Sequence, residues 1–155
     1  MNFGPIERRY PMDTRDYPLP EHTKKLIGKG IAHPTLFDET KGTTNTSEGL
    51  ERINQSIFNI LATTPGERWF MPSFGSNLAR LIFEPNDSIL RDLLQLEVGE
   101  ALRRWEKRIV IDDIMIAIDD MSGNQVNITI IYHLANSNIQ GSYVYPFRRK
   151  VFEYR

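Results

Sequence analysis

The chain has 155 residues, a formal net charge of −1, 40% hydrophobic residues and no cysteine. This size and hydrophobic content suit one domain with its own core, and the balanced charge gives no field that would attract nucleic acid or an anionic membrane. The lack of cysteine excludes disulfides, thiolate metal sites and a thiol nucleophile. Neither a signal peptide nor an apolar run of about 18 residues is visible, so we expect a soluble intracellular protein.

Residues 1–30 differ in composition from the rest of the chain. They contain several prolines and basic residues but few aliphatic ones, which predicts an extended N-terminal arm that does not fold alone. The arm is either a disordered tail or a segment that orders on a partner, with Tyr10 and Tyr17 as anchors. Gly28-Lys29-Gly30 does not match the spacing of a phosphate-binding loop.

The first helix is expected over residues 47–62. Ser47 suits the N-cap position, and Pro65-Gly66 follows the helix and ends it. Apolar residues recur between them at spacings of three and four, which predicts one buried face: Leu50, Ile53, Ile57, Ile60 and Leu61.

The loop that follows, at residues 65–78, is unusually rich in large apolar side chains: Trp69, Phe70, Met71 and Phe74. Each large aromatic buries about 150–250 Å² when it is covered. We therefore predict a rigid, packed connector between two helices, with the polar residues Glu67 and Arg68 at its entrance.

Two further helices are expected, at residues 76–83 and 88–105. Ser76 is a candidate cap for the short one, and Pro85 ends it. Asp87 is a candidate cap for the long one, which carries enough apolar residues to pack on the first helix.

After residue 108 the apolar period changes from that of a helix to that of a strand. Alternation predicts strands at residues 109–119, 126–134 and 142–147, the first two forming an antiparallel hairpin. Pro146 cannot donate to a ladder, so the last strand is an edge or a strand end. Helices followed by a small antiparallel sheet at 109–147 give an α+β fold.

The sequence offers little that resembles a catalytic or metal site. His22, His33 and His133 have no neighbours at metal-ligand spacing, and the aspartate pairs at 112–113 and 119–120 are typical of solvated strand ends. We therefore expect no metal and no cofactor.

Two glutamates are candidates for glycoside hydrolysis, which needs an acid and a base or nucleophile across a cleft. Glu67 adjoins Arg68, and Glu106 stands two residues before Arg108. Pairing with arginine favours the ionised carboxylate, which is the wrong direction for a general acid. An ion-paired structural role is favoured, no catalytic residue is assigned, and hydrolysis stays open as an alternative.

Several motifs occur in a fixed order along the chain: Pro-Gly-Glu-Arg at 65–68, Leu-Ile-Phe-Glu-Pro-Asn-Asp at 81–87, Ala-Leu-Arg-Arg-Trp-Glu-Lys-Arg-Ile at 101–109 and Val-Tyr-Pro-Phe at 144–147. In this order and spacing they resemble the baseplate wedge family of contractile phage tails. That family includes a type VI secretion counterpart and is often labelled "lysozyme-like". The resemblance covers about residues 26–150.

The resemblance implies a structural protein rather than an enzyme, located in the virion at the tail baseplate and assembled in the host cytoplasm. It implies that the C-terminal sheet pairs with the first sheath ring, so that the sheath polymerises from the baseplate. The implied partners are the tail sheath protein, other baseplate wedge proteins, and the tail tube or hub, with no nucleic acid or membrane. Residues 31–150 form the wedge domain, residues 1–30 the arm and residues 151–155 a tail.

The resemblance also implies a set of partner-binding residues. Glu106 and Arg108 are carried over as a charged pair that braces the sheet and contacts sheath or wedge neighbours, whereas Lys107 stands where the family usually has proline. The set is completed by residues at the loop entrance and in the last strand: Glu67, Arg68, Tyr143, Val144, Tyr145 and Phe147. Three alternatives stay open: a peptidoglycan hydrolase that uses Glu67 or Glu106, an ordinary third strand whose aromatics pack on the helices, and a wedge scaffold that never touches sheath.

Overall fold

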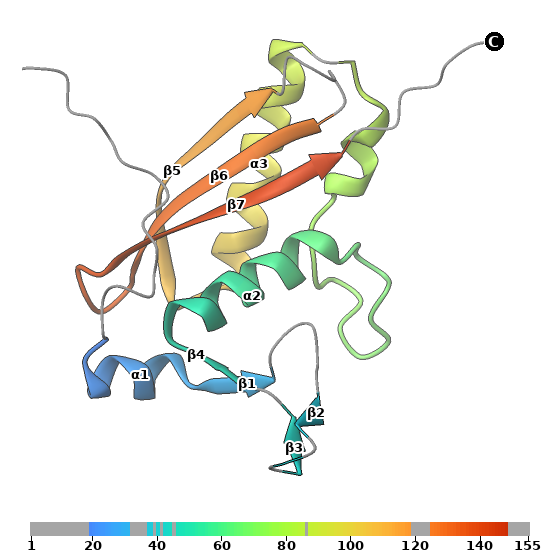
Figure 1. Cartoon of the computed structure of the whole chain (residues 1–155). Helices are drawn as coiled ribbons and strands as arrows, with labels where there is room; N and C mark the ends of the chain where they lie inside the picture. Colours follow the sequence, from blue (N-terminus) through green and yellow to red (C-terminus); the bar gives the residue numbers. More distant parts are fainter. Residues whose placement is uncertain are drawn as a thin grey trace, which may run out of the picture.

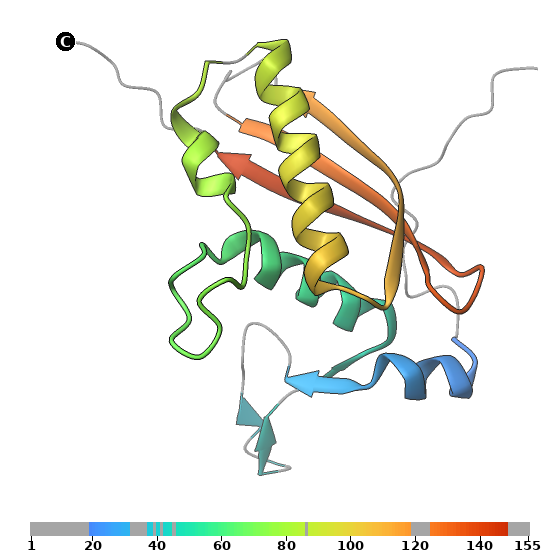
Figure 2. The same cartoon turned by 180° about the vertical axis from the view of Figure 1, so that it is seen from behind.

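A three-stranded antiparallel sheet and two helices on one of its faces make up the body of the molecule (Figures 1 and 2). The strand order is β5-β6-β7. Helix α3 crosses that face of the sheet, and α2 lies beside it along the β7 side. The predicted α+β class is confirmed.

The computed structural model describes residues 19–31, 37–38, 40, 42–44, 46–85, 87–118 and 125–148. The predicted C-terminal tail and most of the predicted arm lie outside these residues. The helices are α1 (Glu21–Ile27), α2 (Gly49–Ala62), the 3₁₀ helix η2 (Leu78–Phe83) and α3 (Ser88–Trp105). The strands are β1 (Lys29–Ile31), β2 (Phe37–Asp38), β3 (Thr43–Thr44), β4 (Thr46–Glu48), β5 (Ile109–Ile118), β6 (Gln125–Leu134) and β7 (Gln140–Arg148).

The two ladders of the main sheet differ in regularity. Strand β7 pairs with β6 without interruption, from Gln125 opposite Arg148 to His133 opposite Gln140. The register of β5 against β6 shifts between Ile111 and Asp113, because Asp112 is an extra residue on β5. The extra residue keeps apolar side chains on the core face on both sides of the shift.

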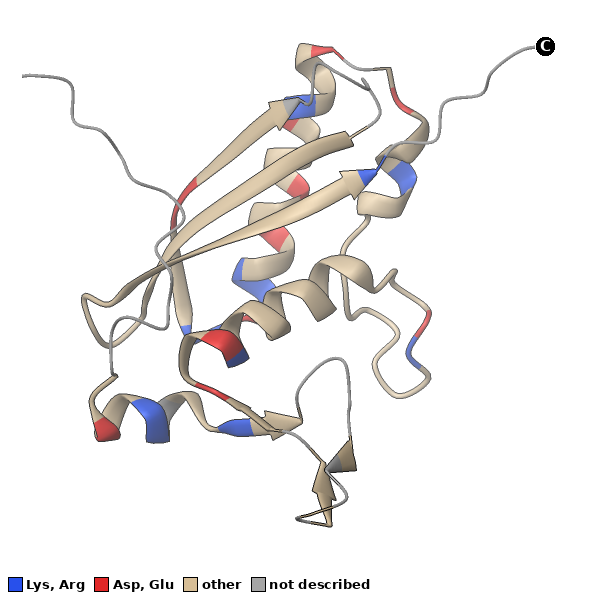
Figure 3. Ribbon diagram, viewed as in Figure 1, with Lys and Arg blue, Asp and Glu red and all other residues tan. Residues whose placement is uncertain are grey.

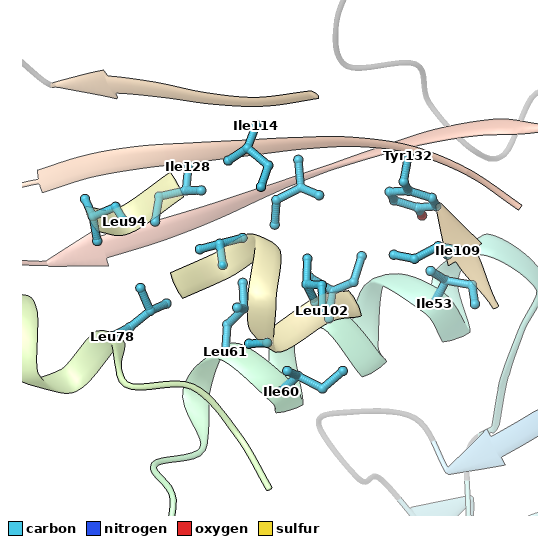
Figure 4. Packing of buried hydrophobic residues seen from close by; sticks show 14 of the residues in the cluster. Ile53, Ile60, Leu61, Leu78, Leu94, Leu102, Ile109, Ile114, Ile128 and Tyr132 are labelled. Atoms are coloured by element: carbon cyan, nitrogen blue, oxygen red, sulfur yellow. The ribbon is translucent and has the colours of Figure 1, made fainter. Parts of the chain in front are cut away.

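The core lies between the sheet and the helices (Figure 4). Alternate residues of β6 point into it, and Tyr132 and Ile128 have no exposed surface. The predicted apolar face of α2 supplies Ile53 and Ile57, both fully buried. Among the described residues, the buried set also includes Leu78, Leu90, Leu94, Val98, Leu102, Ile109, Ile114 and Phe147.

The N-terminal part of the described chain corrects two predictions. Residues 21–27 form α1 rather than extended backbone, and β1 then pairs antiparallel with β4. This pairing places Ser47 opposite Gly30 in a strand, so Ser47 is not the N-cap of α2. Its hydroxyl donates to Gln55 Oε1 instead (2.7 Å), and the helix begins after Glu48.

Of the caps predicted for η2 and α3, only that of α3 is confirmed. Asp87 caps α3 as predicted, because its side chain accepts a hydrogen bond from the Leu90 backbone N–H (2.9 Å). Ser76 does not cap η2: it is buried, and its hydroxyl donates to the Leu61 carbonyl (2.9 Å). Ser76 therefore fastens the end of α2 to the segment before η2.

Candidate partner-binding site

Glu106 and Arg108 form a buried brace where α3 ends and β5 begins. Glu106 is 3% exposed, although it is a glutamate. Its carboxylate accepts hydrogen bonds from Arg108 Nε to Oε1 (2.7 Å) and from Arg108 Nη2 to Oε2. Arg108 Nη1 donates to the carbonyl of Ile27 at the end of α1 (2.8 Å). The pair thus joins α3, β5 and α1.

The electrostatics of the brace follow from these contacts. Burial acts to raise the pKa of the Glu106 carboxyl, but hydrogen bonds from Arg108 and Ser56 and the guanidinium charge outweigh it. The pKa of Glu106 therefore lies below its ordinary value, and the hydrogen bond to Glu106 raises the pKa of Arg108. Both groups are charged at neutral pH, and Ser56 adds α2 to the elements that the pair joins.

Lys107 has its own contact at this junction. It is exposed, and its Nζ donates to the Arg103 carbonyl in the last turn of α3 (2.6 Å). A cation there also complements the negative end of the helix dipole. A cavity of about 180 Å³ adjoins Lys107 and Arg108, with His22 and Ile27 from α1 and the turn after β6 as its other walls.

The predicted strand residues divide between the two faces of β7. Tyr143, Tyr145 and Phe147 lie opposite the core residues of β6, and the ring of Tyr145 is 6.3 Å from that of Phe58 in α2. Burial raises the pKa of the Tyr143 and Tyr145 hydroxyls. Val144 points the other way and is 41% exposed. Of these four side chains, only Val144 lies on the outer face.

The loop between α2 and η2 contradicts the prediction of a fully packed connector. Trp69 is 95% exposed and Phe70 is 100% exposed, and both lie on a loop that projects beyond the helices and the sheet (Figure 1). Phe74 alone among the large side chains packs inward, with its ring 5.1 Å from that of Trp105. Polar contacts at its base, rather than burial of these side chains, hold the loop in place.

Those contacts involve the two charged residues that the sequence singled out. The Glu67 carboxylate accepts a hydrogen bond from the Thr64 N–H (3.0 Å), and the Arg68 guanidinium lies 3.9 Å from the centre of the Phe74 ring. Glu67 and Arg68 therefore lie in this loop, on a different element from the Glu106–Arg108 brace.

The backbone closes the same loop. The Gly66 N–H donates to the Pro72 carbonyl (2.7 Å), and the Ser76 N–H donates to the Thr63 carbonyl (2.9 Å). Gly75 has a φ of +115°, and a Cβ there would lie 2.1 Å from the Thr63 oxygen, so only glycine fits this close approach. The exposed tip thus stands on a rigid base.

Two polar contacts of the sheet join residues that are distant in sequence. The Tyr132 hydroxyl donates to Asn54 Oδ1 in α2 (2.7 Å), and His133 Nδ1 lies 2.7 Å from Asp112 Oδ1 across the bulge. Alternation in β6 predicted the faces of Tyr132 and His133, but neither partner follows from local sequence. Within the described ranges, no group of three or more His, Cys, Asp or Glu side chains could hold a metal ion.

Charged residues are unevenly placed on the described surface (Figure 3). Strand β6 and residues 140–147 of β7 carry no acidic or basic residue other than histidine, whereas β5 carries Asp112 and Asp113. Among the helices that the structure describes, none is long and apolar enough to cross a membrane.

The chain resembles known baseplate proteins in sequence. A sequence model of the family described as "Baseplate wedge protein gp25" matches residues 47–139. Baseplate wedge protein gp25 of Enterobacteria phage T4 is 35% identical over 63 residues, which cover 41% of this chain and 48% of the phage protein. Baseplate protein W of Escherichia phage P2 is 33% identical over 78 residues, covering 47% of this chain and 68% of that protein. The chain therefore spans about half the length of the T4 protein and about two thirds of the P2 protein.

Solved structures agree in fold over most of the described chain. A chain of the anti-feeding prophage baseplate, 27% identical, gives a TM-score of 0.69 and covers 76% of this chain and 93% of its own. A Geobacter sulfurreducens protein with a tail-lysozyme name is 32% identical and gives a TM-score of 0.63. The match covers 68% of this chain and 95% of that protein. A chain of the postcontracted pyocin R2 baseplate is 28% identical and gives a TM-score of 0.51. The match covers 66% of this chain and 99% of that chain. Because the family model matches more than half of the 155 residues, the chain belongs to the baseplate wedge protein gp25 family.

Proposed function

We propose that this protein initiates assembly of the tail sheath by pairing strand β7 with a strand of the first sheath ring. As a member of its family, it is a structural component of the baseplate of a contractile tail. The sheath, the tail tube or hub and the other wedge proteins are the proposed partners. The observation that carries the proposal is the contrast between the two edges of the main sheet.

Strand β7 has the properties of an edge that accepts another strand. Among the described strands its one hydrogen-bonded neighbour is β6, and the β6–β7 register is regular along its whole length. It carries no charge from Gln140 to Phe147, and charge is one of the features that protect an edge strand from pairing. Pro146, near the end of this segment, cannot donate to a further strand. Strand addition uses main-chain groups, so the inward position of Tyr143 and Tyr145 does not oppose it.

Strand β5 has the properties of a protected edge. Its ladder is interrupted at Asp112, and two aspartates stand in succession there. A bulge and charged side chains both discourage pairing with a further strand. Strand β7 is therefore the edge that favours addition of a strand, and β5 is the edge that discourages it.

The brace is proposed to hold the sheet for this task rather than to contact sheath through Glu106. Glu106 is buried and committed to Arg108, while Lys107 is exposed beside the cavity at this junction. We propose that Lys107 and the exposed part of Arg108 make the partner contact there, and that Glu106 positions Arg108.

The same contacts support a non-enzymatic role, although one structural relative carries a tail-lysozyme name. A glycosidase general acid needs a raised pKa, and the pKa of Glu106 is lowered. The Glu67 carboxylate is occupied by the Thr64 N–H. Clearing of peptidoglycan by the wild-type protein, lost in Glu67→Gln, would contradict this part of the proposal.

The edge is tested with matched substitutions on β7 and β5. Val144 and Val110 are 41% and 45% exposed, and both lie on the outer face of an edge strand. Lysine on an edge blocks pairing, so Val144→Lys should fold and enter the baseplate but yield tails without sheath. Val110→Lys should assemble sheath normally.

The readout is electron microscopy of tails from a strain that lacks the gene and is complemented with each variant. Full-length sheath in the Val144→Lys strain would overturn the assignment of β7. Loss of sheath in the Val110→Lys strain alone would move the pairing edge to β5. Baseplates that contain the protein in both strains show that entry and sheath initiation are separate steps.

A further inference from the structure

The loop between α2 and η2 ends in an apolar tip that sheath pairing does not use: Trp69 and Phe70. These are the two most exposed large hydrophobic side chains among the described residues, at 95% and 100%. Adjacent large aromatics in water are uncommon on a protein that works alone, and covering their apolar area on association is favourable. The tip is therefore a candidate surface for a partner.

The tip is already ordered before anything binds it. The loop is closed by the Gly66–Pro72 hydrogen bond, and the Met71 N–H donates to the Arg68 carbonyl (3.2 Å) directly across the tip. Below it, the Arg68 guanidinium lies on the Phe74 ring, which packs against Trp105. A partner therefore meets side chains whose backbone is fixed, and binding does not have to order the loop.

The size of the tip indicates what kind of partner covers it. Two large aromatics bury about 300–500 Å² together. A stable two-protein interface buries about 800 Å² on each side. The tip alone is therefore too small to hold two copies of this chain together. It suits a partner that other contacts already keep nearby, as in a baseplate of several proteins.

The charges beside the tip indicate the chemistry of that partner. Glu67 and Arg68 stand next to each other just before the tip, with opposite signs (Figure 3). Arg68 is engaged with the Phe74 ring. An anionic membrane surface would be matched by a cluster of basic residues. A single balanced pair around aromatic anchors is the pattern of a protein interface, in which a polar rim surrounds a buried centre.

We propose that Trp69 and Phe70 are anchors that enter an apolar pocket of a different baseplate protein, with Glu67 and Arg68 as the rim of that contact. The pocket receives an indole and a phenyl ring, and its border carries polar groups that face the two charges. This surface lies on a different element from β7, so it serves attachment to the wedge rather than sheath initiation.

The test uses the same substitution at two exposed phenylalanines. Phe70→Ser changes the tip, and Phe37→Ser changes an exposed residue of β2 (63%). Both variants should keep the wild-type unfolding temperature, because neither side chain is buried. Baseplates purified from a strain that lacks this protein are then titrated with the full-length variants, and the bound fraction is measured.

Removal of a central aromatic anchor typically weakens binding by about thirtyfold or more. We expect a loss of this size for Phe70→Ser and a larger one for Trp69→Ser with Phe70→Ser, with no change for Phe37→Ser. Incorporation of the double variant at wild-type concentration would overturn the proposal. Incorporation is scored without reference to sheath, so this result is separate from the test of β7.

Because the chain has no cysteine, a single introduced thiol can be labelled specifically, which allows a second measurement on the loop. Ser73→Cys places a single thiol on the exposed part of the loop, next to the tip. A maleimide reagent should label it in the free protein and not in the assembled baseplate. Equal labelling in both states would overturn the proposal.

Two other possible partners of the tip, a lipid surface and a second copy of this chain, are each tested by a separate measurement. If the purified protein floats with phosphatidylcholine or phosphatidylglycerol vesicles and Phe70→Ser does not, the partner of the tip is a lipid surface and not a protein pocket. If the wild-type protein is a dimer in sedimentation equilibrium and Phe70→Ser is not, the partner of the tip is a second copy of this chain. We expect the wild-type protein to show neither.

Discussion

Arg108 joins two groups of the fold, the Glu106 carboxylate and the backbone carbonyl of Ile27, and Ile27 lies 81 residues before Arg108 in the sequence. One guanidinium thereby closes α1 onto the junction of α3 and β5. Because Glu106 is almost fully buried, its charge is tolerated only while Arg108 compensates it. Two predictions of stability depend on this relationship.

The first concerns removal of the buried charge. Glu106→Gln leaves the Arg108 guanidinium without its ionic partner, so we expect a loss of about 3 kcal/mol in the free energy of unfolding, the lower end for a broken buried pair. Arg108 is 32% exposed and water recovers part of the interaction, which is why the lower end applies. Urea unfolding measures the loss.

The matched control is Glu100→Gln on the exposed side of α3, which should change stability by less than about 0.5 kcal/mol. Equal effects of the two substitutions would contradict the brace. Glu106→Ala and Arg108→Ala remove the same pair, and the role that the family resemblance implies predicts that both variants fold but assemble poorly. Any assembly defect in those variants has to be compared with their loss of stability.

The second prediction concerns acid. The pKa of Glu106 is lowered by folding from an ordinary value of 4.5, so its ionised form stabilises the fold at neutral pH. This contribution is complete above about pH 4.5 and is lost as the pH falls through the lower pKa of the folded state. Thermal unfolding of the wild-type protein should therefore be more acid-sensitive below that pH than unfolding of Glu106→Gln. Parallel pH profiles of the two proteins would contradict the assignment.

The third prediction concerns Gly141 on β7. A Cβ there would lie 2.6 Å from Cζ of Tyr132, whose ring is fully buried and whose hydroxyl is fixed by Asn54. The ring cannot move without losing that hydrogen bond. We expect Gly141→Ala to destabilise the protein by about 1–3 kcal/mol through overpacking, as measured by chemical unfolding.

The neighbouring residue provides the control. The Ser142 hydroxyl is buried and has no hydrogen-bond partner among the described residues. Ser142→Ala removes that group and should be neutral or slightly stabilising. A Gly141→Ala protein as stable as Ser142→Ala would show that the Tyr132 ring has room to shift.

Features set by neighbouring residues were predictable from the sequence, and features set by distant ones were not. Asp87 caps α3 through a backbone group three residues ahead, and alternation in β6 gave the core face. Ser47 failed as a cap because β1, far back in the chain, holds it in a strand. The Glu106–Arg108 pair was within reach of the sequence, but its third partner, Ile27, was not.

The prediction for the loop failed for a different reason. Burial of large apolar residues is a rule for a protein that works alone, and it placed Trp69 and Phe70 inside. The rule held for Phe74, which the fold itself covers. The surface of a protein that works within an assembly can retain side chains whose cover comes from elsewhere, and nothing in a single sequence separates the two cases.

The irregular ladder at Asp112 has a consequence for the polarity of growth. A sheet that could be extended at both edges would fit anywhere in a stack of identical units, in the middle as well as at the end. A sheet with one regular edge and one interrupted edge favours a neighbour on the regular side. If β7 pairs with the sheath as we propose, this protein is the first unit in its row and growth proceeds away from the baseplate.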